Sequence, residues 1–138
     1  MQNPPPVQTE QAKSSTGLDE NIAALLSYVF GWISGLIFFL IEKDSRLVRF
    51  HAMQSLLFNV LVAVVGIALW IVLFVVFMIA AQVSGTLATL LSLVSILVWG
   101  VFLLGILAGF ILCLVKAFQG QYFKLPVIGN FAEKFSAK

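Results

Sequence analysis

Four polar side chains with possible chemical roles lie close together after the first charged segment of the chain. His51, Ser55 and Asn59 recur every four residues, and Gln54 lies beside them. In a helix this spacing places the side chains on one face. Such a face can line the entrance of a pore or a substrate path, or it can make hydrogen bonds between helices, because polar groups in lipid need partners. The pattern predicts a polar stripe and leaves both uses open.

The sequence does not predict an enzyme. Catalysis at membrane depth needs paired carboxylates, a Ser or Cys beside a base, or metal ligands, and none of these combinations is present. Cys113 is the single cysteine, which excludes an internal disulfide and a thiol cluster for a metal. We therefore expect no catalytic, cofactor-binding or metal-binding residue, and no nucleic-acid partner. The lack of carboxylates and cations between Arg49 and Lys116 also argues against proton-coupled transport.

The composition predicts an all-α integral membrane protein. Of the 138 residues, 61% are hydrophobic and only 10% are charged, far from the usual range of soluble proteins. Residues 21–41 and 50–115 contain no Asp, Glu, Lys or Arg. A water-soluble core needs a polar shell, whereas long chargeless segments are solvated by lipid, where the backbone must form helices.

The chain divides into three predicted parts. Residues 1–16 are rich in Pro, Gln and Ser and are expected to form a disordered polar tail. Residues 17–119 are a transmembrane domain with three spans, at about 18–41, 46–81 and 87–118, each long enough for a hydrocarbon core of about 30 Å. Residues 120–138 form an interfacial tail. Its apolar residues have mostly helical spacing, which predicts an amphipathic helix lying on the membrane: Phe123, Val127, Ile128, Phe131 and Phe135.

The cations predict how three spans are oriented. An odd number of spans places the loop at residues 42–45 and the C-terminal tail on one face of the membrane. Of the eight cations only Lys13 then lies on the other face. Because cytoplasmic segments carry the excess of Lys and Arg, we expect a multi-pass plasma-membrane protein with its N-terminus outside and its C-terminus in the cytoplasm. Arg46 and Arg49 are expected to contact lipid phosphates.

Small residues four apart predict close helix packing. One stripe contains Ser27, Gly31 and Gly35, and another contains Gly105 and Gly109. Such stripes let helix backbones approach closely in lipid. The first and third helices can use them to pack on each other, or two copies of the chain can use them to associate. The expected partners are therefore membrane lipids, with a homo-oligomer or other membrane proteins left open.

Three stretches resemble a known family. They are Gly17-Leu18-Asp19-Glu20-Asn21-Ile22-Ala23, Val48-Arg49-Phe50-His51-Ala52-Met53-Gln54-Ser55 after Ile41-Glu42-Lys43, and Lys124-Leu125-Pro126-Val127-Ile128-Gly129. Together they are similar to a prokaryotic membrane family of unknown function that is grouped with the twenty-kilodalton subunit of the chloroplast inner-envelope Tic import translocon. The resemblance implies a small helical protein that works in a protein-conducting assembly, with His51 and Gln54 in the family motif.

Two functions remain after these steps. The first is a non-enzymatic membrane scaffold or assembly subunit, which the small-residue stripes and the lack of reactive groups favour. The alternative is a component of a protein-conducting or small-solute pore or transport assembly, which the polar stripe and the resemblance favour.

Overall fold

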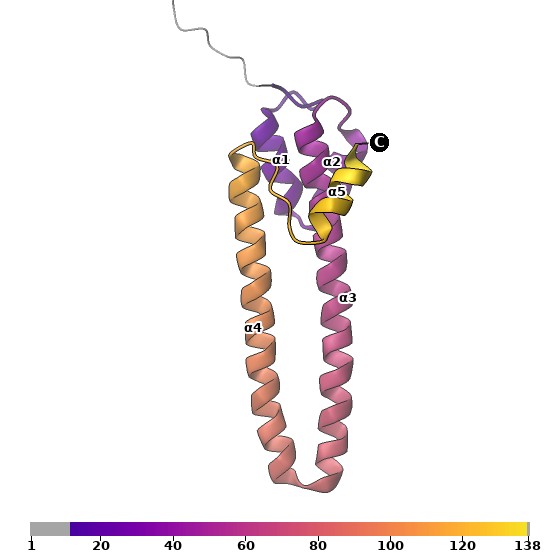
Figure 1. Ribbon diagram of the computed structural model, residues 1–138, viewed down its shortest axis with the longest axis vertical. Coiled ribbons are helices and arrows are strands. Elements are labelled where there is room, and N and C mark those ends of the chain that lie inside the picture. The colour runs from indigo at the N-terminus through magenta and orange to yellow at the C-terminus, as the bar shows by residue number, and fades with distance from the viewer. Residues whose placement is uncertain (1–11, 138) are drawn as a thin grey trace, which may run out of the picture.

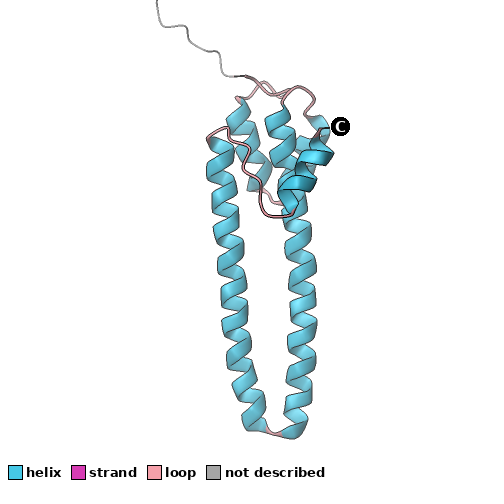
Figure 2. Ribbon diagram, in the orientation of Figure 1, coloured by secondary structure: helices cyan, strands magenta, loops and turns pink. Residues whose placement is uncertain are grey.

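The computed structural model describes residues 12–137, and every regular element in that range is a helix. These are α1 (Glu20–Val29), α2 (Trp32–Ile41), α3 (Arg46–Val83), α4 (Gly85–Phe118) and α5 (Ile128–Ser136). Helices α3 and α4 form a long antiparallel hairpin, while α1, α2 and α5 gather at one end of it (Figure 1; the helices are cyan in Figure 2). We call that end the headpiece: it comprises α1, α2, α5, residues 46–59 of α3 and residues 110–118 of α4. The opposite end, Val83–Gly85, is the apex.

Helices α3 and α4 lie at the residues predicted for the second and third spans. They contain 38 and 34 residues, and their most apolar windows have mean hydropathies of 3.2 and 2.7. At 1.5 Å per residue they are about 57 and 51 Å long, more than the roughly 30 Å of a hydrocarbon core. Almost no side chain in these windows is buried inside the protein, unlike those of the core helix of a soluble domain. Both helices can therefore cross a membrane.

The prediction of one continuous helix over residues 18–41 is wrong, and three spans are not confirmed. The segment forms α1 and α2, which turn back on each other at Phe30 and Gly31 (Figure 1). Gly31 has φ of +61°, a conformation that glycine adopts without steric cost. Ser34 Oγ accepts a hydrogen bond from the backbone N–H of Phe30 (3.1 Å) and donates one to Ser27 O (3.0 Å). Each helix has 10 residues, about 15 Å, which is half a hydrocarbon core.

The loop before α3 ties the start of the described chain to the headpiece. The buried Glu42 carboxylate accepts hydrogen bonds from the backbone N–H groups of Ser15 (3.0 and 3.1 Å), Asp44 (3.0 Å) and Ser45 (2.9 Å). Burial alone would raise the pKa of Glu42, but these bonds outweigh burial and lower the pKa below its ordinary value. Ser45 also caps α3 by accepting from Val48 N (3.2 Å). Of the predicted disordered tail, residues 1–11 lie outside the described residues, whereas Ser15 bonds to Glu42 and Asp44 in the loop before α3.

The C-terminal segment returns along the headpiece after α4 ends. Residues 119–127, which we call the strap, run beside α3 and lead into α5 (Figure 1). Helix α5 lies within the stretch predicted to be helical. Its Ile128, Gly129 and Ala132 are buried, while Phe131 and Phe135 are about half exposed. The close approach requires a glycine, because a Cβ on Gly129 would lie 2.5 Å from Lys124 Cα.

Candidate functional site

The predicted polar stripe is buried in the headpiece. His51, Gln54 and Ser55 have no exposed surface, and Asn59 is partly buried one turn further along α3. These side chains lie among α1, the turn at Gly31 and the strap. No buried side-chain nitrogen or oxygen among the described residues lacks a hydrogen-bond partner. The stripe is therefore a satisfied polar cluster.

The hydrogen bonds of His51 assign its tautomer. Its Nε2 lies 2.9 Å from the backbone carbonyl oxygen of Gln121, which can only accept, so Nε2 carries the proton. The Nδ1 atom of the neutral ring is then an acceptor, and the Tyr28 hydroxyl donates to it over 3.0 Å. His51 thus joins α1 to the strap through one neutral ring.

Gln54 is the hub of the cluster. Its amide nitrogen donates to the Tyr28 hydroxyl (3.1 Å) and to the Phe123 carbonyl (3.0 Å), and it lies 3.6 Å from Cys113 Sγ. Its amide oxygen accepts from the backbone N–H of Leu125 (3.2 Å). One side chain thereby satisfies two backbone groups of the strap, a loop without regular structure. Because buried backbone groups need partners, Gln54 holds the strap against α3.

Ser55 and Asn59 act locally. Ser55 Oγ donates to the Gly31 carbonyl at the turn between α1 and α2 (3.2 Å). Asn59 Nδ2 donates to the Ser55 carbonyl in its own helix (2.8 Å). Asn59 Oδ1 faces Gly31, since a Cβ there would lie 3.2 Å from it. The stripe thus connects α3 to the turn at Gly31 and to the strap, and it does not line an open path.

Tyr28 and the strap backbone complete the cluster, and the sequence reasoning missed both. Tyr28 is 1% exposed and follows Ala24 by one helical turn, on the buried face of α1. Its four-residue spacing from Ala24 is a signal that could have identified it, because residues four apart share one face of a helix. The carbonyl and N–H groups of residues 121–125 leave no such signal, because every residue has them.

The side chains around His51 and Cys113 are hydrogen-bonding groups from several elements. His51 contacts a tyrosine hydroxyl and a carbonyl, and the Cys113 thiol is buried beside Gln54 and Tyr28. Within residues 12–137, no three His, Cys, Asp or Glu side chains lie together as a metal-binding group would. In chemical terms, the cluster links secondary-structure elements by hydrogen bonds.

The small residues predicted for helix packing differ in how closely another helix approaches them. Gly35 packs tightly on α3, since a Cβ there would lie 2.9 Å from the Ala52 carbonyl oxygen. Ser27 is buried and bonds within α1, donating to Ala24 O (2.6 Å). A Cβ on Gly105 would have nothing within 4 Å, and a Cβ on Gly109 would lie 3.5 Å from the Phe58 ring. Helix α1 does pack on α4, but through Cys113 and Ala117 in a cluster that also contains Ala23, Ala24, Tyr28, Leu47 and Val48.

The two arginines predicted to bind lipid have different surroundings. Arg49 Nη1 donates to the carbonyls of Glu42 (2.8 Å) and Phe39 (3.3 Å), and its Nε donates to the carbonyl of Ser136 (3.3 Å). Its guanidinium also lies 4.7 Å from the Phe39 ring centroid. Arg49 therefore joins α2, α3 and α5. Arg46 is exposed instead.

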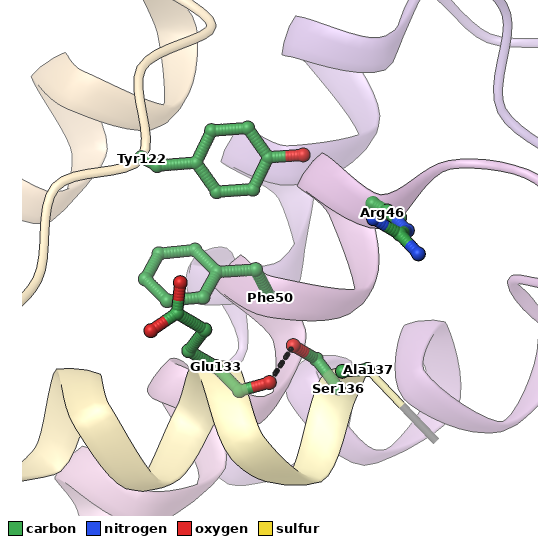
Figure 3. A pocket seen from close by; sticks show the side chains of 6 residues that line it. All are labelled: Arg46, Phe50, Tyr122, Glu133, Ser136 and Ala137. Atoms are coloured by element: carbon green, nitrogen blue, oxygen red, sulfur yellow. Dashed lines mark hydrogen bonds between the residues drawn. The ribbon is translucent and has the colours of Figure 1, made fainter.

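Arg46 lines a pocket of about 410 Å³ between the start of α3, the strap and α5. Figure 3 shows its lining residues, which are Arg46, Phe50, Tyr122, Glu133, Ser136 and Ala137. The Tyr122 ring lies over Phe50, with centroids 5.4 Å apart. Partial burial and then the Glu20 carboxylate raise the pKa of Tyr122, and Arg46 partly opposes them. The Tyr122 hydroxyl is therefore a hydrogen-bond donor at neutral pH.

The fold and the satisfied cluster define an all-helical membrane protein with two candidate membrane-spanning helices. The chain belongs to the magnetosome magnetite crystal formation protein family, whose model matches residues 18–132. A UPF0132 membrane protein of Methanocaldococcus jannaschii is 38% identical over 125 residues, covering 90% of this chain and 94% of that protein. Another from Archaeoglobus fulgidus is 34% identical over 117 residues, covering 85% and 95%. No solved structure matches. The prediction of a prokaryotic membrane family is confirmed.

Proposed function

We propose that this chain is a non-enzymatic scaffold or assembly subunit of the plasma membrane. One observation carries the proposal. The side chains of His51, Gln54 and Ser55 form hydrogen bonds that hold α1, α3 and the strap together. The headpiece is thereby a rigid platform at one end of two lipid-facing helices. The family description names magnetosome magnetite crystal formation. Our proposal for this chain is confined to scaffolding, because the contacts that support it are hydrogen bonds between elements of the headpiece.

We further propose that both tails lie in the cytoplasm. The orientation with the N-terminus outside depended on three spans, and the turn at Gly31 brings the start of α1 back to the end of α2, where Ser45 Oγ donates to the Glu20 carboxylate. With two spans, every cation among residues 12–137 lies at the headpiece end, and the apex at Val83–Gly85 carries none. This distribution follows the positive-inside rule more closely than three spans do. The half-exposed Phe131 and Phe135 support an interfacial position for α5.

Cysteine labelling in intact cells tests this orientation. In a Cys113→Ala background, we expect Ser84→Cys at the apex to react with an impermeant thiol reagent. Lys13→Cys and Ala137→Cys should be protected until the cells are lysed. Labelling of Lys13→Cys together with protection of Ala137→Cys in intact cells would restore the three-span orientation.

The transport alternative has a direct test of its own. The resemblance to the Tic import subunit stays a prediction, and the strap covers the polar stripe that would line a path. We expect purified protein in vesicles to give no conductance or solute flux above that of protein-free vesicles. In cells, chemical cross-linking should capture defined membrane-protein partners or a second copy of the chain. Flux that is lost in His51→Ala and Asn59→Leu variants would contradict the scaffold proposal.

A further inference from the structure

The pocket beside Arg46 presents both signs of charge. Arg46 contributes a guanidinium and Glu133 a carboxylate, and the two residues come from α3 and α5. The salt bridge found among residues 12–137 joins Lys124 and Glu133, so Arg46 has no carboxylate partner in this part of the chain. Arg49, one turn further along α3, is by contrast occupied by three carbonyl groups. Arg46 is therefore the arginine that is available to an anion.

The carboxylate side of the pocket keeps a free acceptor. Lys124 Nζ lies 2.6 Å from Glu133 Oε2, and both side chains are about half exposed, so this pair is weak. Lys124 is not among the residues that line the pocket. Among the described residues the second carboxylate oxygen has no hydrogen-bond donor, and Figure 3 shows the carboxylate beside the Phe50 ring. An ammonium group can bind there.

The aromatic residues give the pocket an apolar wall and a polar rim. Phe50 is 1% exposed and forms the floor, whereas Tyr122 is 55% exposed and offers both its ring and its hydroxyl. An aromatic face attracts an alkylammonium group, and a phenol hydroxyl donates to a phosphate oxygen. The ligand that fits these walls carries a phosphate and an amine separated by a short apolar linker.

We propose that this pocket binds the headgroup of a zwitterionic phospholipid, such as phosphatidylethanolamine, with the phosphodiester on Arg46 and the ammonium between Glu133 and Tyr122. The inference rests on the proposed cytoplasmic-leaflet position of the headpiece. A purely anionic headgroup would bring no donor to the second Glu133 carboxylate oxygen, which Lys124 does not contact. A free phosphate would leave the aromatic wall and the carboxylate unused.

The surroundings of the pocket suit a lipid source. Arg46 and Phe50 share one face of α3 with Leu57, Leu61 and Val64, because their spacing keeps them within one helical stripe. On that face, beyond the point where α5 crosses α3, lies an apolar groove of about 290 Å³ with eight lining residues from α3, α5 and the end of the strap. Along α3 the polar pocket beside Arg46 is thus followed by the apolar groove. This is the order in which a lipid presents its headgroup and its acyl chain.

Lipid titration of the delipidated full-length protein in detergent tests the proposal. Native mass spectrometry would measure binding of phosphatidylethanolamine, phosphatidylglycerol and soluble glycerophosphoethanolamine. We expect phosphatidylethanolamine to bind most tightly, and Arg46→Gln to weaken it about tenfold, as expected for the loss of one charge-assisted hydrogen bond. Glu133→Gln should remove the preference for phosphatidylethanolamine over phosphatidylglycerol. Lys134→Gln, on α5 but outside the lining, is the matched control and should bind as the wild type does.

Each contrary outcome has a definite meaning. Equal binding of the two lipids by the wild type would overturn the recognition of the amine, and unchanged binding by Arg46→Gln would overturn the site. Binding of glycerophosphoethanolamine as tight as that of the lipid would identify a soluble ligand and contradict a lipid site. Circular dichroism of each variant would show that its helices are intact. Cysteine labelling tests the orientation independently, so failure of the lipid site is distinguishable from failure of the proposed function.

Discussion

Gln54→Leu is expected to lower the free energy of unfolding by about 3–5 kcal/mol. Leucine has a similar volume but leaves the Leu125 N–H and the Phe123 carbonyl without their Gln54 partner, and it removes the donor to the Tyr28 hydroxyl. Each buried polar group that loses its partner costs about 1–3 kcal/mol. Thermal unfolding in detergent, followed by circular dichroism, measures the loss. Hydrogen exchange should show that the strap opens first.

Asn59→Leu is the matched control for Gln54→Leu. Its side chain is only partly buried, and its amide donates to a carbonyl of the same helix, which already takes part in the helical hydrogen-bond ladder. We expect a change below about 1 kcal/mol. If Asn59→Leu were as destabilising as Gln54→Leu, the strap contacts would not be what makes Gln54 important. The polar character of α3 as a whole would then be responsible.

The sequence predicted α3 and α4 well because their signal is strong and local. Long chargeless segments must be helical in lipid, and the polar residues near 45 and 84 mark where those helices begin. The segment over residues 21–41 is also free of charged side chains but has a different fold. Hydropathy does not register that Gly31 can adopt positive φ, or that Ser34 can satisfy the backbone at Phe30 and Ser27. A turn that depends on one glycine and one serine is not visible in an average over twenty residues.

The sequence predicted only part of the candidate site, because only part of its signal is local. The four-residue spacing of His51, Ser55 and Asn59 identified the correct face of α3, since helical periodicity is a local property. The partners of that face include the backbone of residues 121–125, about seventy positions away in the chain. No pattern in the sequence of the strap marks those groups. Arg46 and Arg49 likewise lie in the same helix and look equivalent in the sequence. They differ because α2 and α5 pack around Arg49 and supply the carbonyls that it binds, whereas Arg46 stays exposed.

Gly35→Ile is expected to destabilise the fold by about 3 kcal/mol without changing the oligomeric state. A Cβ at this position would lie 2.9 Å from the Ala52 carbonyl oxygen and 3.2 Å from Leu56 N, both on the backbone of α3. A helix backbone cannot yield as a flexible side chain can, so α2 must move away from α3. Thermal unfolding in detergent measures the loss, and size-exclusion chromatography with light scattering measures the number of copies in each particle.

Gly105→Ile separates packing within the chain from association between chains. Nothing lies within 4 Å of a Cβ at Gly105, so we expect the free energy of unfolding to stay within about 0.5 kcal/mol of the wild type. If Gly35→Ile dissociated an oligomer and kept the wild-type unfolding temperature, the stripe on residues 27–35 would be an interface between copies. If Gly105→Ile dissociated one, the open face of α4 would be that interface. The small-residue spacing is the same at both glycines, so the backbone opposite each one decides the outcome.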